Sequence, residues 1–231
     1  MNQGYSTSYD AGLNRFFSQI YLKVALGIGV SAVVSFIMLR FMPMLPIMIY
    51  SSFPLLIVLI LAEVMICFMC SRRAYSGNPT STMIWYMVYS VINAISLTAL
   101  FEAVSDPGAI TKAFISTAIT FVIMSIYGRT TKRNLSAWRN FLLGTGWGII
   151  IALLINFFLG SSVISLLCSI VSVVLFAAYM AYDTQMAVRL YNAASTEEEL
   201  KGLATYSAMA LYMDLVDMFI NLVYLFSDND N

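Results

Sequence analysis

Seven apolar segments, each close to the ~20 residues that a bilayer-spanning helix needs, constrain this chain more than any other feature. They lie at about 19–40, 46–71, 82–103, 110–128, 140–160, 162–188 and 203–226. Of the 231 residues, 60% are hydrophobic and only 10% are charged, whereas a soluble domain carries about 25% charged residues. No soluble fold of this size needs so much apolar surface. The pattern predicts an all-α, polytopic membrane protein.

The same segments divide the chain into three parts. Residues 1–18 are a polar N-terminal tail, 19–226 the seven-helix membrane domain, and 227–231 a short C-terminal tail. The first tail has no basic region followed by a small-residue cleavage site, so the first span is expected to stay as an anchor. Pro54 falls inside the second span and predicts a kink there.

The basic residues predict how the chain crosses the membrane. In a seven-span arrangement ten of the twelve fall on one side, and only Arg40 and Lys112 fall on the other. The ten are Arg15, Lys23, Arg72, Arg73, Arg129, Lys132, Arg133, Arg139, Arg189 and Lys201. Because basic residues stay on the cytoplasmic side, we expect the N-terminus inside and the C-terminal tail outside. The short tails and compact loops favour a bacterial cytoplasmic membrane.

Composition and motifs argue against an enzyme. The chain has no histidine, which excludes a His-ligated metal and a histidine general base. No HExxH or GxSxG motif occurs, and the last span has no lysine that could hold a chromophore. An aspartyl intramembrane protease usually carries GxGD, whereas Leu-Tyr-Met precedes Asp214. We expect no catalytic residue, no cofactor and no nucleic-acid partner.

Two local patterns give further expectations. Gly144 and Gly148 form a GxxxG step in the fifth span, which is typical of close helix packing. Glu197–Glu199 form an acidic run before the last span. Ser195 or Thr196 can cap a helix there, and acids are favourable in its first turn.

The last two spans carry aspartates inside apolar sequence. A carboxylate at membrane depth costs at least ~2.5 kcal/mol, so it needs a partner or a function. In both spans the polar and small residues recur every three or four positions and so share one helix face. The two faces are Ser165, Ser169, Ser172, Phe176, Tyr179 and Asp183, then Ser207, Ala210, Asp214, Asp217 and Asn221. Such residues can simply hold helices together, which is the structural alternative.

Consecutive helices joined by a short loop are usually antiparallel neighbours, so the two faces are expected to meet. Two carboxylates in contact cannot both ionise cheaply and would share one proton. Asp183 and Asp214 are expected at similar depth in the membrane. Asp217 lies one turn farther along the same face and is the alternative to Asp214 as the partner of Asp183. Glu63 in the second span reaches a comparable depth and lies either on an ion path or in a packing contact.

Three motifs resemble a known family. FISTAITFVIMSIYGRTTKRNLS (Phe114–Ser136), VLFAAYMAYDTQ (Val174–Gln185) and ALYMDLVDMFINLVYLF (Ala210–Phe226) are similar to the transmembrane Bax inhibitor motif family. Their order and spacing agree over almost the whole chain. One departure is Asn134, where the family usually has an aspartate.

The resemblance implies a seven-helix bundle whose last helix is surrounded by the other six. It also implies a calcium-permeable leak gated by two aspartates, which map onto Asp183 and Asp214. These two would sense pH and could contribute calcium ligands. The family's arginine latch maps onto Arg72 or Arg73, and the pattern does not choose between them.

Family members are also implicated in binding a membrane protease, which gives the second functional hypothesis. In that case the chain would be a non-conducting regulator of a membrane protease or another integral membrane protein, with structural aspartates. The expected partners are therefore the lipid bilayer and calcium ions and, under the second hypothesis, such a protease.

Overall fold

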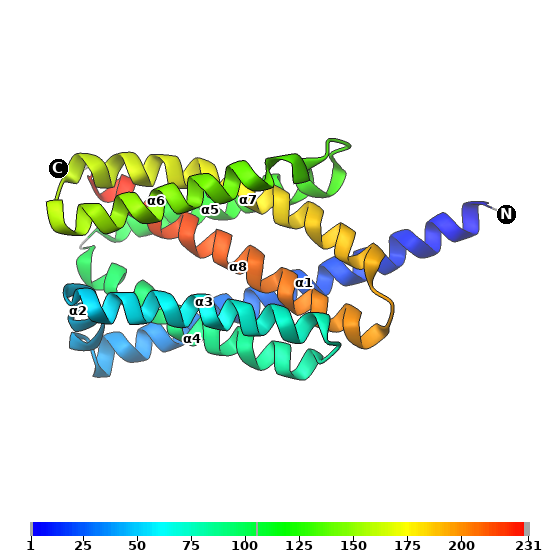
Figure 1. The fold of residues 1–231 in the computed structure, drawn as a ribbon, viewed down its shortest axis with the longest axis horizontal. Helices are drawn as coiled ribbons and strands as arrows, with labels where there is room; N and C mark the ends of the chain where they lie inside the picture. The colour runs from blue at the N-terminus through cyan, green and yellow to red at the C-terminus, as the bar shows by residue number, and fades with distance from the viewer. Residues whose placement is uncertain (1, 105, 229–231) are drawn as a thin grey trace. The chain divides into compact units, whose positions relative to one another are not determined.

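A computed structural model describes residues 2–104 and 106–228. These residues form helices and no strands (Figure 1). In chain order the elements are α1 (Asn2–Phe41), α2 (Met44–Ser51), α3 (Phe53–Tyr75), α4 (Pro79–Ala103), α5 (Pro107–Thr130), the 3-10 helix η1 (Leu135–Trp138), α6 (Arg139–Leu159), α7 (Ser162–Ala193) and α8 (Glu197–Asp228).

Seven stretches of the described residues are long and apolar enough to cross a membrane. They are Tyr9–Phe41, Phe53–Tyr75, Pro79–Ala103, Pro107–Thr130, Leu135–Leu159, Ser162–Ala193 and Glu197–Ser227. Each corresponds to one predicted span. The predicted class, a polytopic all-α membrane protein, is therefore confirmed.

The chain ends differ from the predicted tails. Helix α1 begins at Asn2, so most of the segment predicted as a polar tail continues the first span as helix. Phe16 and Phe17 on this extension are buried, which a polar tail would not provide. At the other end α8 continues to Asp228, and residues 229–231 of the predicted C-terminal tail lie outside the described residues.

The second predicted span is broken rather than kinked. Ser52 has an extended backbone, with φ −109° and ψ 109°, and separates the short helix α2 from α3. Proline lacks the N–H that an interior helical position donates, and its ring clashes with the preceding turn. A break at Ser52 puts Pro54 in the first turn of α3, where that donor is not needed.

The described chain forms two compact units. The first contains residues 2–103 and 187–212, and the second contains residues 104, 106–186 and 213–228. Helices α7 and α8 each contribute to both units. The expectation that the last helix is surrounded by the other six concerns both units together and stays a prediction.

In the first unit, α4 packs against α1 and α3. Its buried face includes Tyr86 and Tyr89, whose rings meet the ring of Tyr212 on α8 edge to face. The Tyr212 hydroxyl donates to Asn93 Oδ1 at 3.3 Å and hydrogen bonds Ser31 Oγ at 2.5 Å. Buried polar groups thus hold three helices of this unit in register.

In the second unit, buried Leu135, Leu142, Leu175, Ala181 and Tyr182 form one hydrophobic cluster. Helices α6 and α7 are joined by a tight turn at Gly160, which has φ +61°. This left-handed conformation suits glycine at a helix C-terminus. Gly144 and Gly148 have nothing within 4 Å of a Cβ position, so the predicted close packing at these glycines is wrong.

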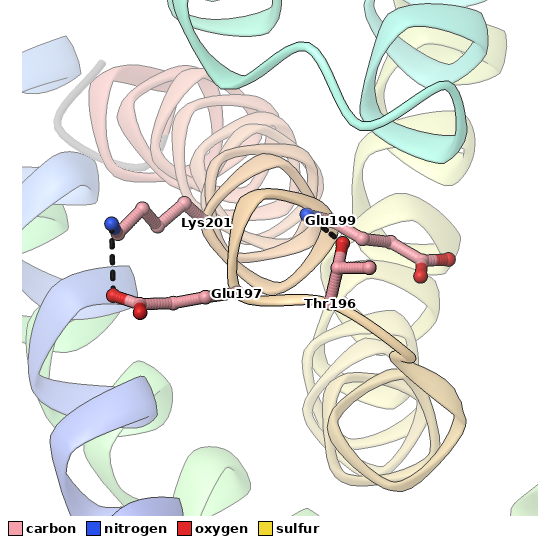
Figure 2. A network of polar contacts seen from close by, with 4 residues as sticks. All are labelled: Thr196, Glu197, Glu199 and Lys201. Carbon is pink, nitrogen blue, oxygen red and sulfur yellow. Dashed lines mark hydrogen bonds and ion pairs between the residues drawn. The ribbon is translucent and has the colours of Figure 1, made fainter.

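The start of α8 follows the capping prediction. Thr196 Oγ1 accepts from the backbone N–H of Glu199 at 3.1 Å, and Glu199 Oε2 accepts from the N–H of Ser195 at 2.9 Å. Glu197 forms an ion pair with Lys201 at 2.9 Å on the other side of the turn (Figure 2). The cap is confirmed, and the acidic run lies in the first helical turn.

Candidate functional site

The second unit brings the two predicted aspartates together. Asp183 lies on α7 and Asp214 on α8, and their carboxyl groups hydrogen bond to each other. Asp214 is 5% exposed, whereas Asp183 is half-buried. An ionised carboxylate only accepts hydrogen bonds, so a direct bond between two of them requires a proton on one. The two carboxyl groups therefore form one acidic pair between α7 and α8.

Further polar groups surround the pair. Asp214 Oδ2 is buried and has no hydrogen-bond partner in the part of the chain that the structure describes. The phenol of Tyr179, one turn before Asp183, lies within electrostatic reach of both carboxyl groups. Asp217 also acts electrostatically on Asp214. The site is thus a cluster of acidic side chains with one phenol beside it.

Gly128 on α5 allows α7 to pack closely against α5 at the turn before Asp183. A Cβ at residue 128 would lie 2.3 Å from the carbonyl oxygen of Ala181 and 2.9 Å from Cβ of Thr184. No side chain fits there without moving the backbone of the turn that carries Asp183. The glycine lets the two helices meet backbone to backbone.

Gln185 ties the same turn of α7 to the loop between α5 and η1. Its Nε2 donates to the carbonyl of Arg133 at 2.8 Å, and its Oε1 accepts from the N–H of Leu135 at 2.9 Å. Both bonds go to backbone groups that flank Asn134. Leu135 is buried in the hydrophobic cluster next to Ala181 and Tyr182. The loop is therefore anchored to α7 at Gln185, two residues after Asp183.

Asn134 performs the capping role that an aspartate would perform. Its Oδ1 accepts from the N–H of Ser136 at 3.0 Å at the start of η1. Asn and Asp are equally good at this position. The departure from the family's usual residue therefore changes the charge of the loop but keeps the hydrogen bond.

Sequence reasoning identified the aspartates but assigned no role to Gly128 or Gln185. Both residues lie inside the motifs that carry the family resemblance, at YGRTTKR and AYDTQ. Those motifs were the available signal. Because the two motifs are about fifty residues apart in the chain, the sequence did not predict that they contact each other.

The other predicted site residues belong to the first unit, except Asp217. Arg72 and Arg73 are exposed at the C-terminal end of α3. Glu63, also on α3, is half-buried, and its Oε1 has no hydrogen-bond partner in the described residues. The latch role of the arginines and the place of Glu63 and Asp217 on an ion path stay predictions.

Calcium ligation by Asp183 and Asp214 also stays a prediction. Within residues 2–104 and 106–228, no group of three or more Cys, Asp or Glu side chains is arranged to hold a metal ion. Calcium takes six to eight oxygens. An ion at the pair would therefore draw most of its ligands from water or backbone carbonyls.

The seven long apolar helices define an integral, polytopic α-helical membrane protein. The sequence profile described as "Inhibitor of apoptosis-promoting Bax1" (Bax1-I) matches residues 13–231. The chain therefore belongs to this Bax inhibitor-like family.

Bacterial relatives match over nearly their whole length. The chain is 35% identical to an uncharacterized membrane protein of Streptococcus pyogenes serotype M1, covering 97% of each chain. It is 37% identical to the protein YrjE of Lactococcus lactis, over 93% of this chain and 91% of that one. It is 28% identical to the inner membrane protein YbhL of Escherichia coli K12, over 94% and 93%.

Proposed function

We propose that this protein is a pH-sensitive, calcium-permeable leak channel gated by the Asp183–Asp214 pair. The observation that carries the proposal is the hydrogen bond between two carboxyl groups on α7 and α8. A purely structural polar contact would not need two acids, because one acid and one amide could hold the helices without a shared proton.

The protonated pair is the closed state. One proton held between Asp183 and Asp214 links α7 to α8. When the proton leaves, two like charges ~4 Å apart repel by about 4 kcal/mol at an effective dielectric constant of ~20. That energy shifts a two-state equilibrium by roughly a thousandfold, enough to open a gate that was mostly closed. Flux therefore rises as pH rises through the titration of the pair.

The open state offers calcium the hard oxygen ligands that it prefers. Two carboxylates supply only part of its coordination shell, which favours passage over tight binding. Arg72 or Arg73 serves in this proposal as a latch that stabilises one carboxylate, and Asp217 and Glu63 extend the ion path.

The proposed location is the bacterial cytoplasmic membrane, with the N-terminus inside and the C-terminus outside. The distribution of basic residues supports the orientation. The printed name of YbhL, an inner membrane protein, supports the location.

Calcium entry into dye-loaded liposomes tests the proposal against a non-conducting regulator. Purified protein should admit calcium above the rate of empty liposomes, more at pH 8 than at pH 6. Absence of flux at every pH would overturn the channel and favour the regulator of a membrane protease or other integral protein. Crosslinking in native membranes would then identify that partner.

A further inference from the structure

An open apolar groove of ≈ 830 Å³ lies between α1 and α4 in the first unit. Leu22 and Leu26 of α1 face Ile84, Met87, Val88 and Val91 of α4 along it. Several of these side chains are strongly exposed, including Leu22 at 64% and Ile84 at 57%. Inside a bilayer, such a groove would be filled by an acyl chain rather than by water.

One end of the groove is basic. Lys23 of α1 and Lys201 of α8 line it there, together with Thr205 and Thr80. The Lys201 side chain is 50% exposed and pairs with Glu197, which is 78% exposed. The groove thus has an apolar lining along its length and two lysines at one end, which is the arrangement of a phospholipid site.

Lys23 lacks a counter-charge in the described part of the chain. Its Nζ donates to the hydroxyl of Thr205 at 2.6 Å and to the carbonyl of Lys201 at 3.2 Å, and both acceptors are neutral. An ammonium group has three N–H donors, so one remains. A half-buried cation favours a negative partner, and a phosphate at this opening would supply one.

The length of the groove fits one leaflet. From Thr80 to Ile92 the lining face of α4 spans ~18 Å at 1.5 Å per residue. Half of a ~30 Å hydrocarbon core is about 15 Å. A second hollow of ≈ 500 Å³ continues along α1 past Leu26 to Val33 and gives room for a second acyl chain of the same lipid.

We propose that this groove binds one anionic phospholipid, with its phosphate at Lys23 and Lys201 and an acyl chain between α1 and α4. The site lies wholly within the first unit and does not depend on the gate proposed at Asp183 and Asp214. Lys23→Gln keeps a side-chain donor toward Thr205 but removes the charge. Leu26→Trp fills part of the groove with a larger side chain and leaves both lysines unchanged.

Native mass spectrometry of the detergent-purified protein, titrated with phosphatidylglycerol or phosphatidylcholine of identical chains, tests this site. The unaltered protein should retain one phosphatidylglycerol in preference to phosphatidylcholine. Lys23→Gln should weaken phosphatidylglycerol retention about tenfold, as expected for loss of a charge-assisted bond. Leu26→Trp should weaken retention of both lipids.

Two matched variants serve as controls. Lys132→Gln removes an exposed loop lysine, and Val122→Trp enlarges an exposed α5 residue at 54% exposure. Both should bind as the unaltered protein does. If Lys23→Gln does not fold, Lys201→Gln at the exposed lysine provides the charge test. Equal retention of the two lipids by the unaltered protein, or equal losses in the control variants, would overturn the site.

Discussion

Gln185 on α7 accepts a hydrogen bond from the backbone N–H of Leu135 at 2.9 Å. This bond joins the helix that carries Asp183 to a loop fifty residues earlier in the chain. The same side chain donates to Arg133 at 2.8 Å. Because Asp183 lies two residues before Gln185, these bonds attach the loop to the turn of α7 that carries Asp183.

Gln185→Leu should loosen that loop. Removing two hydrogen bonds of about 1 kcal/mol each raises the open population of the loop at least fivefold. Trypsin should then cut faster at Lys132 and Arg133, which are exposed. Gln185→Glu keeps the acceptor for Leu135 and should be intermediate. Unchanged cleavage of Gln185→Leu would contradict the role of this residue as an anchor.

Gly128→Ala should destabilise the protein by about 1–3 kcal/mol, because the new methyl group overlaps the Ala181 carbonyl. Thermal unfolding in detergent measures the effect. Gly148→Ala is the matched control, since nothing lies within 4 Å of its Cβ position. That control should gain about 0.5–1 kcal/mol through reduced backbone freedom. Equal effects at the two glycines would contradict the close contact of α5 with α7.

Asn134→Asp should leave stability within about 0.5 kcal/mol, because the carboxylate can accept the same bond from the Ser136 N–H. Asn134→Ala removes the acceptor and should cost about 1 kcal/mol. Thermal unfolding of the two variants compares them directly. A loss in the aspartate variant as large as in the alanine variant would mean that charge, rather than capping, decides this position.

Tyr212→Phe should destabilise the first unit by about 1–3 kcal/mol. It removes the hydroxyl that bonds Ser31 and Asn93 and leaves the buried amide oxygen of Asn93 without this donor. Tyr75→Phe is the control, because Tyr75 is 54% exposed at the end of α3. A melting temperature equal to that of the control would show that the buried network contributes nothing.

Much of the fold follows from local sequence. Apolar length predicts the seven spans, and the three-and-four spacing of polar residues places Asp183 and Asp214 on faces that meet. The threonine cap of α8 is also a local signal, because it depends on residues within one turn.

The missed features depend on contacts between distant segments. Gly144 and Gly148 match a packing motif but face open space, whereas Gly128 matches none and makes the tight contact. Glycine spacing alone does not distinguish them, because the neighbouring helix decides which glycine is covered. The helical extension of α1 likewise depends on burial of Phe16 and Phe17, which their polar neighbours conceal.

The most direct measurement of the central claim is the pH profile of calcium entry into liposomes carrying the Asp183→Asn variant. The asparagine amide can donate to Asp214 without a titrating proton, so the variant should stay closed and show no rise in flux from pH 6 to 8. The unaltered protein should show that rise, and Asp217→Asn should retain it. A variant that leaks with the unaltered pH dependence would contradict the gate.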